Sequence, residues 1–135
     1  MAKRFIFTYL FTNDLHKMKE FYSNILHLKL IWDSDDSIAY KIGDHQLDIE
    51  YDQDFKPMSR KYSWQPGWKG GTEARTSWSL ECDRPDFEEI VASAQAAKAP
   101  SFHAEPQWVG YWSFPLLDPM GNTVEVTCGE PEPTK

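Results

Sequence analysis

The chain has 135 residues, a formal net charge of −7 and an aromatic content of 15%, with six tryptophans. This length predicts one compact domain or two small, interdependent halves with enough residues to bury a core. The negative charge argues against nucleic acid as a partner, because phosphate binding needs a basic surface. No apolar run approaches a membrane-spanning length, and two cysteines do not form a disulfide framework, so we expect a cytoplasmic protein without a membrane partner.

The first half of the sequence predicts a βαβββ unit. Residues 4–12 alternate and are rich in Phe, Tyr and Thr, which is typical of a half-buried strand. Asn13 and Asp14 offer a helix N-cap, and apolar residues at helical spacing predict a helix over 14–27. Turn residues then separate three further expected strands, at 28–34, 38–42 and 45–51.

The second half repeats this pattern. A strand begins at Thr76, and Pro85 opens a helix that Lys98 and Pro100 end. The remaining strands are expected at 101–105, 111–117 and 123–128, with a turn at Asp118-Pro119-Met120-Gly121-Asn122 before the last one.

Each half closes on a strand with one acid between two aliphatic residues, Leu47-Asp48-Ile49 and Val124-Glu125-Val126. Such a duplication predicts that equivalent residues of the two halves converge on one cavity. The expected organisation is a first module at 1–52, a long connection at 53–74, a second module at 75–128 and a flexible tail at 129–135. The connection holds Trp64 and Trp68, and a role as a lid is left open.

Three segments resemble the vicinal-oxygen-chelate superfamily, which includes glyoxalase I, extradiol dioxygenases, fosfomycin-resistance enzymes and bleomycin-resistance proteins. They are Asn13-Asp14-Leu15 with the helix after it, the stretch from Gly110 into the turn at 118–122, and Val124-Glu125-Val126. The resemblance implies an α+β fold. Two βαβββ modules in tandem would form a curved mixed sheet of half-barrels around a cavity, with the helices outside. It also implies a homodimer.

In metal-dependent members of this superfamily, the ligands lie on the first and last strands of each module. These positions correspond here to Phe7, Asp48, Ser77 and Glu125. Phe7 has no lone pair, and a serine hydroxyl is a poor ligand for transition metals, which prefer imidazole, thiolate or carboxylate. No two histidines have the spacing of a metal motif. We therefore expect no cofactor, although the resemblance leaves a divalent metal as an alternative.

Aromatic rings and carboxylates are the candidate ligand contacts. Rings on a concave sheet would stack a planar or apolar molecule, although core packing or a dimer interface would also explain them. Strand alternation places Asp48 and Glu125 opposite their aliphatic neighbours, where either would hold a cation; Glu50 shares the face of Asp48 and could replace it. The expected ligand-binding residues are Phe7, Tyr9, Phe11, Asp48, Ser77, Trp112, Phe114 and Glu125.

Two functions are compatible with this pattern. The first is a metal-free binding protein, similar to the bleomycin-resistance type, that holds a small aromatic or cationic molecule. The second is a lyase or isomerase similar to glyoxalase I, or another metal-assisted enzyme of the superfamily, with Glu125 as metal ligand or general base. A metal-free enzyme, with Glu125 as the base and Tyr9 or Ser77 as the hydrogen-bond donor, is a third arrangement.

Overall fold

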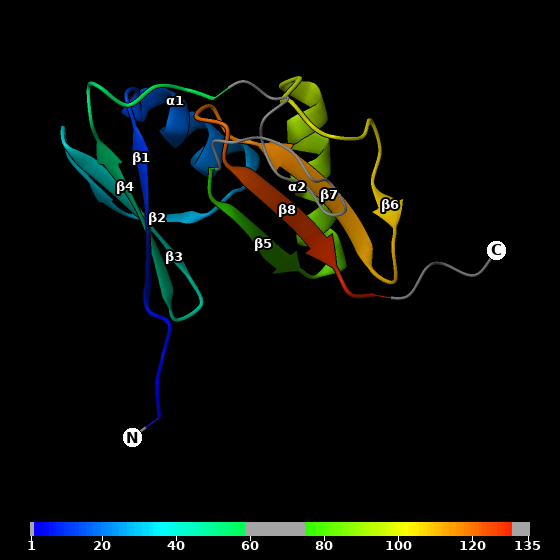
Figure 1. Cartoon of the computed structure of the whole chain (residues 1–135). Coiled ribbons are helices and arrows are strands. Elements are labelled where there is room, and N and C mark those ends of the chain that lie inside the picture. The colour runs from blue at the N-terminus through cyan, green and yellow to red at the C-terminus, as the bar shows by residue number, and fades with distance from the viewer. Residues whose placement is uncertain (1, 59–74, 131–135) are drawn as a thin grey trace. The chain divides into compact units, whose positions relative to one another are not determined.

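The computed structural model describes residues 2–58 and 75–130, so Trp64, Trp68 and most of the predicted connection at 53–74 lie outside the described residues. The chain divides into two compact units, Met1–Pro57 and Met58–Lys135 (Figure 1). Each unit carries a four-stranded mixed sheet together with helical structure between its first two strands. The predicted α+β class, with two βαβββ modules in tandem, is confirmed.

The sheet of the first unit has the strand order β1-β4-β3-β2. β1 (Phe7–Thr12) is parallel to β4 (His45–Tyr51), whereas β3 (Ser37–Ile42) is antiparallel to both β4 and β2 (Lys29–Asp33). Side chains of a strand alternate between the two faces, so one face carries the core and the other is more open. The buried residues of the core face on β1, β3 and β4 are Leu10, Thr12, Ile38, Tyr40, Leu47 and Ile49.

The helix of the first unit changes its winding half-way along. It begins as α1 (Leu15–Lys19), with the Asp14 carboxylate accepting a hydrogen bond from the Lys17 backbone N–H, and continues as the π-helical segment Glu20–Ile25. The predicted helix is therefore present, with ends one or two residues inside the expected range. The π-helical turn was not predicted, because the spacing of apolar residues does not distinguish it from an α-helix.

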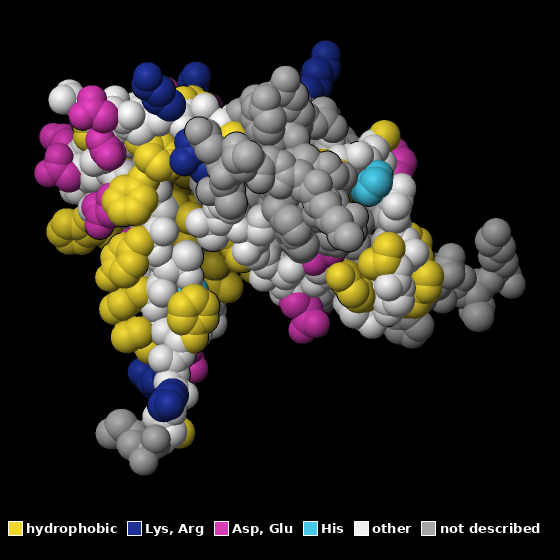
Figure 2. All heavy atoms as spheres, viewed as in Figure 1, with side chains coloured by type: hydrophobic (Ala, Val, Ile, Leu, Met, Phe, Trp, Pro, Cys, Tyr) yellow, Lys and Arg dark blue, Asp and Glu magenta, His cyan; other side chains and the backbone are white. Residues whose placement is uncertain are grey.

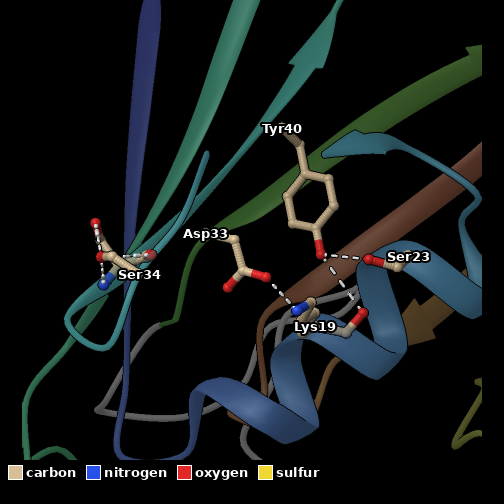
Figure 3. Close-up of polar contacts among 6 residues, drawn as sticks. Lys19, Ser23, Asp33, Ser34 and Tyr40 are labelled. Atoms are coloured by element: carbon tan, nitrogen blue, oxygen red, sulfur yellow. Dashed lines mark hydrogen bonds and ion pairs between the residues drawn. The ribbon is translucent and has the colours of Figure 1, made fainter. Parts of the chain in front are cut away.

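Tyr40 joins this helix to the sheet. Its hydroxyl lies 2.7 Å from Ser23 Oγ and donates a longer hydrogen bond of 3.4 Å to the Lys19 carbonyl (Figure 3). Lys19 also forms an ion pair with Asp33 of β2. Burial raises the pKa of Tyr40, the Ser23 contact lowers it and the charge of Asp33 raises it, with a net increase. The phenol therefore stays protonated and serves as a structural donor.

The second unit repeats the arrangement with the strand order β5-β8-β7-β6. β5 (Ser77–Cys82) is parallel to β8 (Thr123–Cys128), and β7 (Trp112–Leu117) is antiparallel to β8 and to the short β6 (Gln107–Trp108). The helix α2 (Arg84–Ala96) packs against β5 and β8 (Figure 1). No helix within the described ranges is long and apolar enough to cross a membrane.

The strand expected at 101–105 was wrong. Ser101 makes only an isolated bridge with Leu116, and the edge strand forms later, at Gln107–Trp108. The Ser101 hydroxyl donates a 2.7 Å hydrogen bond to the carbonyl of His103, which bends the backbone where an extended chain was expected. Serine side chains commonly divert the backbone in this way.

Asp118 organises the turn between β7 and β8. Its Oδ1 accepts hydrogen bonds from the backbone N–H groups of Met120 (2.9 Å) and Asn122 (3.0 Å), and its Oδ2 accepts one from Asn122 Nδ2 (2.8 Å). Gly121 has φ +92°, and a Cβ at this position would lie 2.9 Å from the Cβ of Met58. Both the backbone conformation and the close approach therefore require glycine.

The same turn binds the backbone on either side of the segment that the structure does not describe. The Met58 N–H donates to the carbonyl of Met120 at 3.1 Å, and the Thr76 N–H donates to Oδ1 of Asn122 at 3.2 Å. The Thr123 N–H in turn donates to the carbonyl of Thr76 at 3.0 Å. Met58 and Thr76 are thus attached to one place in the second unit.

Candidate functional site

The second unit gathers hydroxyl groups around one buried carboxylate. Glu125 lies in the middle of β8 and is 8% exposed. Its Oε1 accepts a hydrogen bond from Ser79 Oγ at 2.7 Å, and its Oε2 accepts from Ser113 Oγ at 2.6 Å and from the Tyr111 hydroxyl at 3.1 Å. Three donors therefore occupy most of the roughly four lone-pair positions of the carboxylate.

Strand register produces this cluster. Ser79 is the parallel partner of Glu125, and Ser113 is the antiparallel partner of Thr127, the next residue on the same face of β8. Alternation leaves Val124 and Val126 on the other face, where α2 packs against the sheet. The cluster is thus placed on the face of the second sheet opposite α2.

Tyr111 is the residue just before β7, and its hydroxyl reaches Glu125. Gly110 precedes it with φ +99°, a backbone conformation that glycine adopts without strain. Burial of the hydroxyl raises the pKa of Tyr111, and both its hydrogen bond to Glu125 and the charge of that carboxylate raise it further. The phenol therefore remains a donor at neutral pH. The sequence analysis could not predict that Tyr111 donates to Glu125, because this contact depends on the register of β7 against β8.

Ser77 supplies a hydroxyl that no described residue uses. Its Oγ is buried and has no hydrogen-bond partner among the described residues. Ser77 lies two residues before Ser79 on β5, so the two serines share a face of the sheet. A buried polar group without a partner costs about 1–3 kcal/mol.

The first unit presents a different surface, rich in aromatic rings. Phe7, Tyr9 and Phe11 of β1 are between 41 and 53% exposed, and the rings of Phe7 and Tyr9 lie 6.1 Å apart. Asp48 is the parallel partner of Tyr9, and its Oδ1 accepts a 2.7 Å hydrogen bond from Gln46 Nε2. Hydrophobic side chains gather over β1 at the left of Figure 2. Four of the predicted ligand-binding residues thus share one face of the first unit.

The structure corrects the expected placement of Trp112 and Phe114. Phe114 is 1% exposed and pairs with Val126, so it belongs to the core on the face that α2 covers. Trp112 lines a groove beside α2. Alternation along β7 puts Ser113, between them, on the face of Glu125. Trp112 and Phe114 therefore share the face opposite Glu125, so the expectation that they line one cavity with Glu125 is wrong.

The side chains at the four positions that hold metal in related proteins do not suit a divalent metal. Phe7 offers only carbon, and Ser77 offers a neutral hydroxyl. The Glu125 oxygens already accept three hydrogen bonds, and Asp48 accepts one. No group of three His, Cys, Asp or Glu residues within 2–58 and 75–130 is arranged to hold an ion.

A known protein family matches the part of the chain that carries this site. The sequence model of the Glyoxalase/Bleomycin resistance protein/Dioxygenase superfamily matches residues 4–126. The chain belongs to this superfamily. The match covers both βαβββ modules and includes Glu125 with its three hydroxyl donors. Comparison with curated protein sequences gives no match.

Solved structures of the superfamily share the fold. A glyoxalase/dioxygenase from Nostoc punctiforme aligns with a TM-score of 0.74 at 19% identity, over 93% of this chain and 90% of its own. A lactoylglutathione lyase from Agrobacterium tumefaciens aligns with a TM-score of 0.66 at 22% identity, over 95% of each chain. A fosfomycin resistance protein from Mesorhizobium loti has a TM-score of 0.67 at 15% identity, over 96% of this chain and 94% of its own. At these identities the likeness shows the fold alone.

Proposed function

We propose that this superfamily member binds a small organic molecule without a metal, and that Glu125 is the residue that recognises a cationic or hydrogen-bond-donating group of the ligand. The supporting observation is a buried carboxylate whose three donors are all neutral hydroxyls. Such donors orient the carboxylate but do not neutralise its charge. A buried charge is stable only when it is well hydrogen-bonded or paired, so a ligand cation would complement it.

The buried hydroxyl of Ser77 adds a second polar contact to this proposal. It shares the face of the Glu125 cluster and lacks a partner among the described residues. A ligand that offers an acceptor or a donor there would satisfy the hydroxyl. Separately, the exposed rings of Phe7, Tyr9 and Phe11 suit the stacking of a planar group. We propose a cation as the ligand class of the Glu125 cluster and, independently, a planar group as the ligand class of the aromatic face of the first unit.

The geometry around Glu125 agrees better with ligand binding than with base catalysis by this residue. A general base must direct a free lone pair at the proton that it removes. Most lone-pair positions of Glu125 are engaged by Ser79, Ser113 and Tyr111. A metal would find about one lone-pair position of this carboxylate unoccupied. We therefore favour the binding role over a lyase or isomerase that uses Glu125 as base or ligand.

The test uses a planar acridinium dye and acridone, its uncharged analogue, with protein treated with a chelator. We expect saturable binding of the acridinium ion, followed by dye fluorescence, and much weaker binding of acridone. Glu125→Gln should weaken acridinium binding about tenfold, equivalent to about 1.4 kcal/mol, the range of a charge-assisted hydrogen bond. Glu81→Gln, at an exposed position on the same face of β5, is the matched control and should bind as the parent does.

Metal analysis of protein purified without a chelator tests the metal-free part of the proposal. Stoichiometric metal that disappears in Glu125→Gln would overturn the proposal. So would turnover of a hemithioacetal by a protein that does not bind the acridinium ion. Circular dichroism of each variant would establish that the fold is retained.

A further inference from the structure

A concave surface lies in the second unit, on the face of the sheet opposite Glu125. It is an open groove of about 390 Å³ along α2, between the helix and the chain around β6. Phe87, Val91 and Trp112 give it an apolar lining. The volume falls within the range of about 300–1,000 Å³ that is usual for small-molecule sites. The groove is therefore large enough for one ring and a short side chain.

The indole of Trp112 is the most specific feature of the groove. The guanidinium carbon of Arg84 lies 5.8 Å from the ring centroid, within the range of a cation–π contact. Trp108 packs against the same indole at 5.6 Å and 68°, an edge-to-face arrangement that fixes its orientation. This ring therefore already accommodates a positive charge from its own chain.

The charges around the groove favour a cation. Arg84 is compensated, because its Nε lies 3.1 Å from Oε2 of Glu130 and its Nη1 lies 3.9 Å from Oε1 of Glu88. Glu105 receives a hydrogen bond of 3.2 Å from the neutral amide of Gln95. The described lining of the groove thus carries two carboxylates, Glu88 and Glu105, and one guanidinium, which Glu130 also pairs, so negative charge is in excess there. An organic anion would meet repulsion there, whereas an ammonium group would find a partner.

We propose that this groove is a second binding site and takes a small amphipathic cation. The ligand's apolar ring would lie on Val91 and Trp112, and its ammonium group would point to Glu88 and Glu105. The carboxylates and the indole come from three segments of the second unit, α2, the loop before β6 and the start of β7, which the fold brings together. The proposal does not depend on the function proposed for the Glu125 cluster.

Phenethylammonium is a suitable probe, and 3-phenylpropionate is an anion of nearly the same size. Each would be titrated into the ¹⁵N-labelled full chain and followed by NMR. We expect phenethylammonium to shift the indole N–H resonance of Trp112, identified by its absence in Trp112→Phe, together with amide resonances of α2. The response should saturate below roughly 20 mM, whereas the anion should bind at least tenfold more weakly.

Two pairs of variants test the placement. Ala92→Phe fills the groove from an exposed position of α2 and should abolish binding, whereas Ala96→Phe, exposed one turn further along and outside the groove, should not. The double change Glu88→Gln and Glu105→Gln should weaken binding at least fivefold, whereas Glu89→Gln should leave it unchanged. Charge, not the shape of one residue, would then account for the selectivity.

Three results would overturn the groove proposal. One is the absence of saturable shifts at Trp112 and α2. Another is an equal response to 3-phenylpropionate. The third is binding that survives Ala92→Phe but disappears in Glu125→Gln, with shifts at Tyr111 and Ser113; this would place the cation at the Glu125 cluster instead. Loss of acridinium binding in Glu125→Gln with retained phenethylammonium binding would support both proposals separately.

Discussion

Tyr111 and Ser113 donate to the same carboxylate oxygen, Oε2 of Glu125, at 3.1 and 2.6 Å, while Ser79 occupies the other oxygen from β5. The carboxylate is thus fixed from both of its neighbouring strands. A group held in this way does not need to be ordered when a ligand arrives, which is how preorganisation improves affinity. The two serines supply this support with short side chains that lose little conformational freedom.

The Tyr111–Glu125 contact predicts an unusual titration. Burial, the hydrogen bond and the negative charge of Glu125 all raise the pKa of Tyr111, so its phenolate should form at higher pH than that of an ordinary tyrosine. The absorbance change at 295 nm, taken as the difference between the parent protein and Tyr111→Phe, measures this step. Glu125→Gln should bring the transition to lower pH. An unchanged transition in Glu125→Gln would contradict the contact.

Cys82 should be a slow nucleophile. Burial is the largest cause that raises its pKa from 9.0 to about 11, and the charges of Asp86, Asp83, Cys128 and Glu81 raise it further. The thiolate is the reactive form, so alkylation by iodoacetamide at pH 8, measured by mass spectrometry, should be much slower than for a free thiol. Alkylation of Cys82 as fast as in the unfolded chain would refute this expectation.

The same shift has a consequence for stability. Between pH 9 and 11 the unfolded thiol is ionised while the folded thiol still holds its proton, so the folded state binds more protons. The Cys82 contribution should therefore lower the stability of the folded state as the pH rises through this range, and should be absent below about pH 8. Denaturant titrations of the parent protein and Cys82→Ala at pH 8 and pH 10.5 provide the comparison. The variant should lose less stability between these two values.

Asp118→Ala should be strongly destabilising. The change removes the acceptors of three hydrogen bonds and leaves the N–H groups of Met120 and Asn122 buried without this partner. We expect a loss of roughly 2–4 kcal/mol in the free energy of unfolding. Asp44→Ala, at an exposed position in the turn between β3 and β4, should change it by less than about 0.5 kcal/mol. Similar losses for the two variants would show that Asp118 does not hold its turn.

The placement of Phe114 can be tested against that of Phe7. Phe114 is almost completely buried, so Phe114→Ala should cost about 3–5 kcal/mol in the free energy of unfolding. Phe7→Ala, on the open face of β1, should cost far less. Chemical denaturation of both variants measures these two changes in the free energy of unfolding. A small loss for Phe114→Ala would indicate that this ring lies outside the core.

Sequence patterns predicted most strands well because burial on one face imposes a period of two. β4 has its predicted bounds, and β3 and β7 each differ from theirs by one residue. β6 was misplaced because a short edge strand buries little, so the hydroxyl of Ser101 could decide the local path. Local preferences of this kind are not visible in hydrophobic periodicity.

The candidate site was predicted only in part, for a related reason. Glu125 could be selected from the sequence because it interrupts an aliphatic strand. Its donors Ser79, Ser113 and Tyr111 could not, because their meeting depends on the register between three strands that are distant in sequence. Trp112 and Phe114 were assigned to the cavity of Glu125 because they are aromatic, whereas the pleat places both on the opposite face of the sheet. The convergence of the two modules' faces on one cavity stays a prediction.

The backbones of Met58 and Thr76 are hydrogen-bonded to the same turn, at Met120 and Asn122 respectively. The distance that the intervening stretch must span is therefore set by that turn, whatever the number of residues between them. The entropic cost of joining two fixed chain positions rises only slowly with the number of residues between them, by about 0.6 kcal/mol for each doubling. Insertions or deletions between these residues should thus leave the pairing of β5 with β8 intact. The turn around Asp118 thus fixes two chain positions between which a segment of different length could be inserted into this superfamily scaffold.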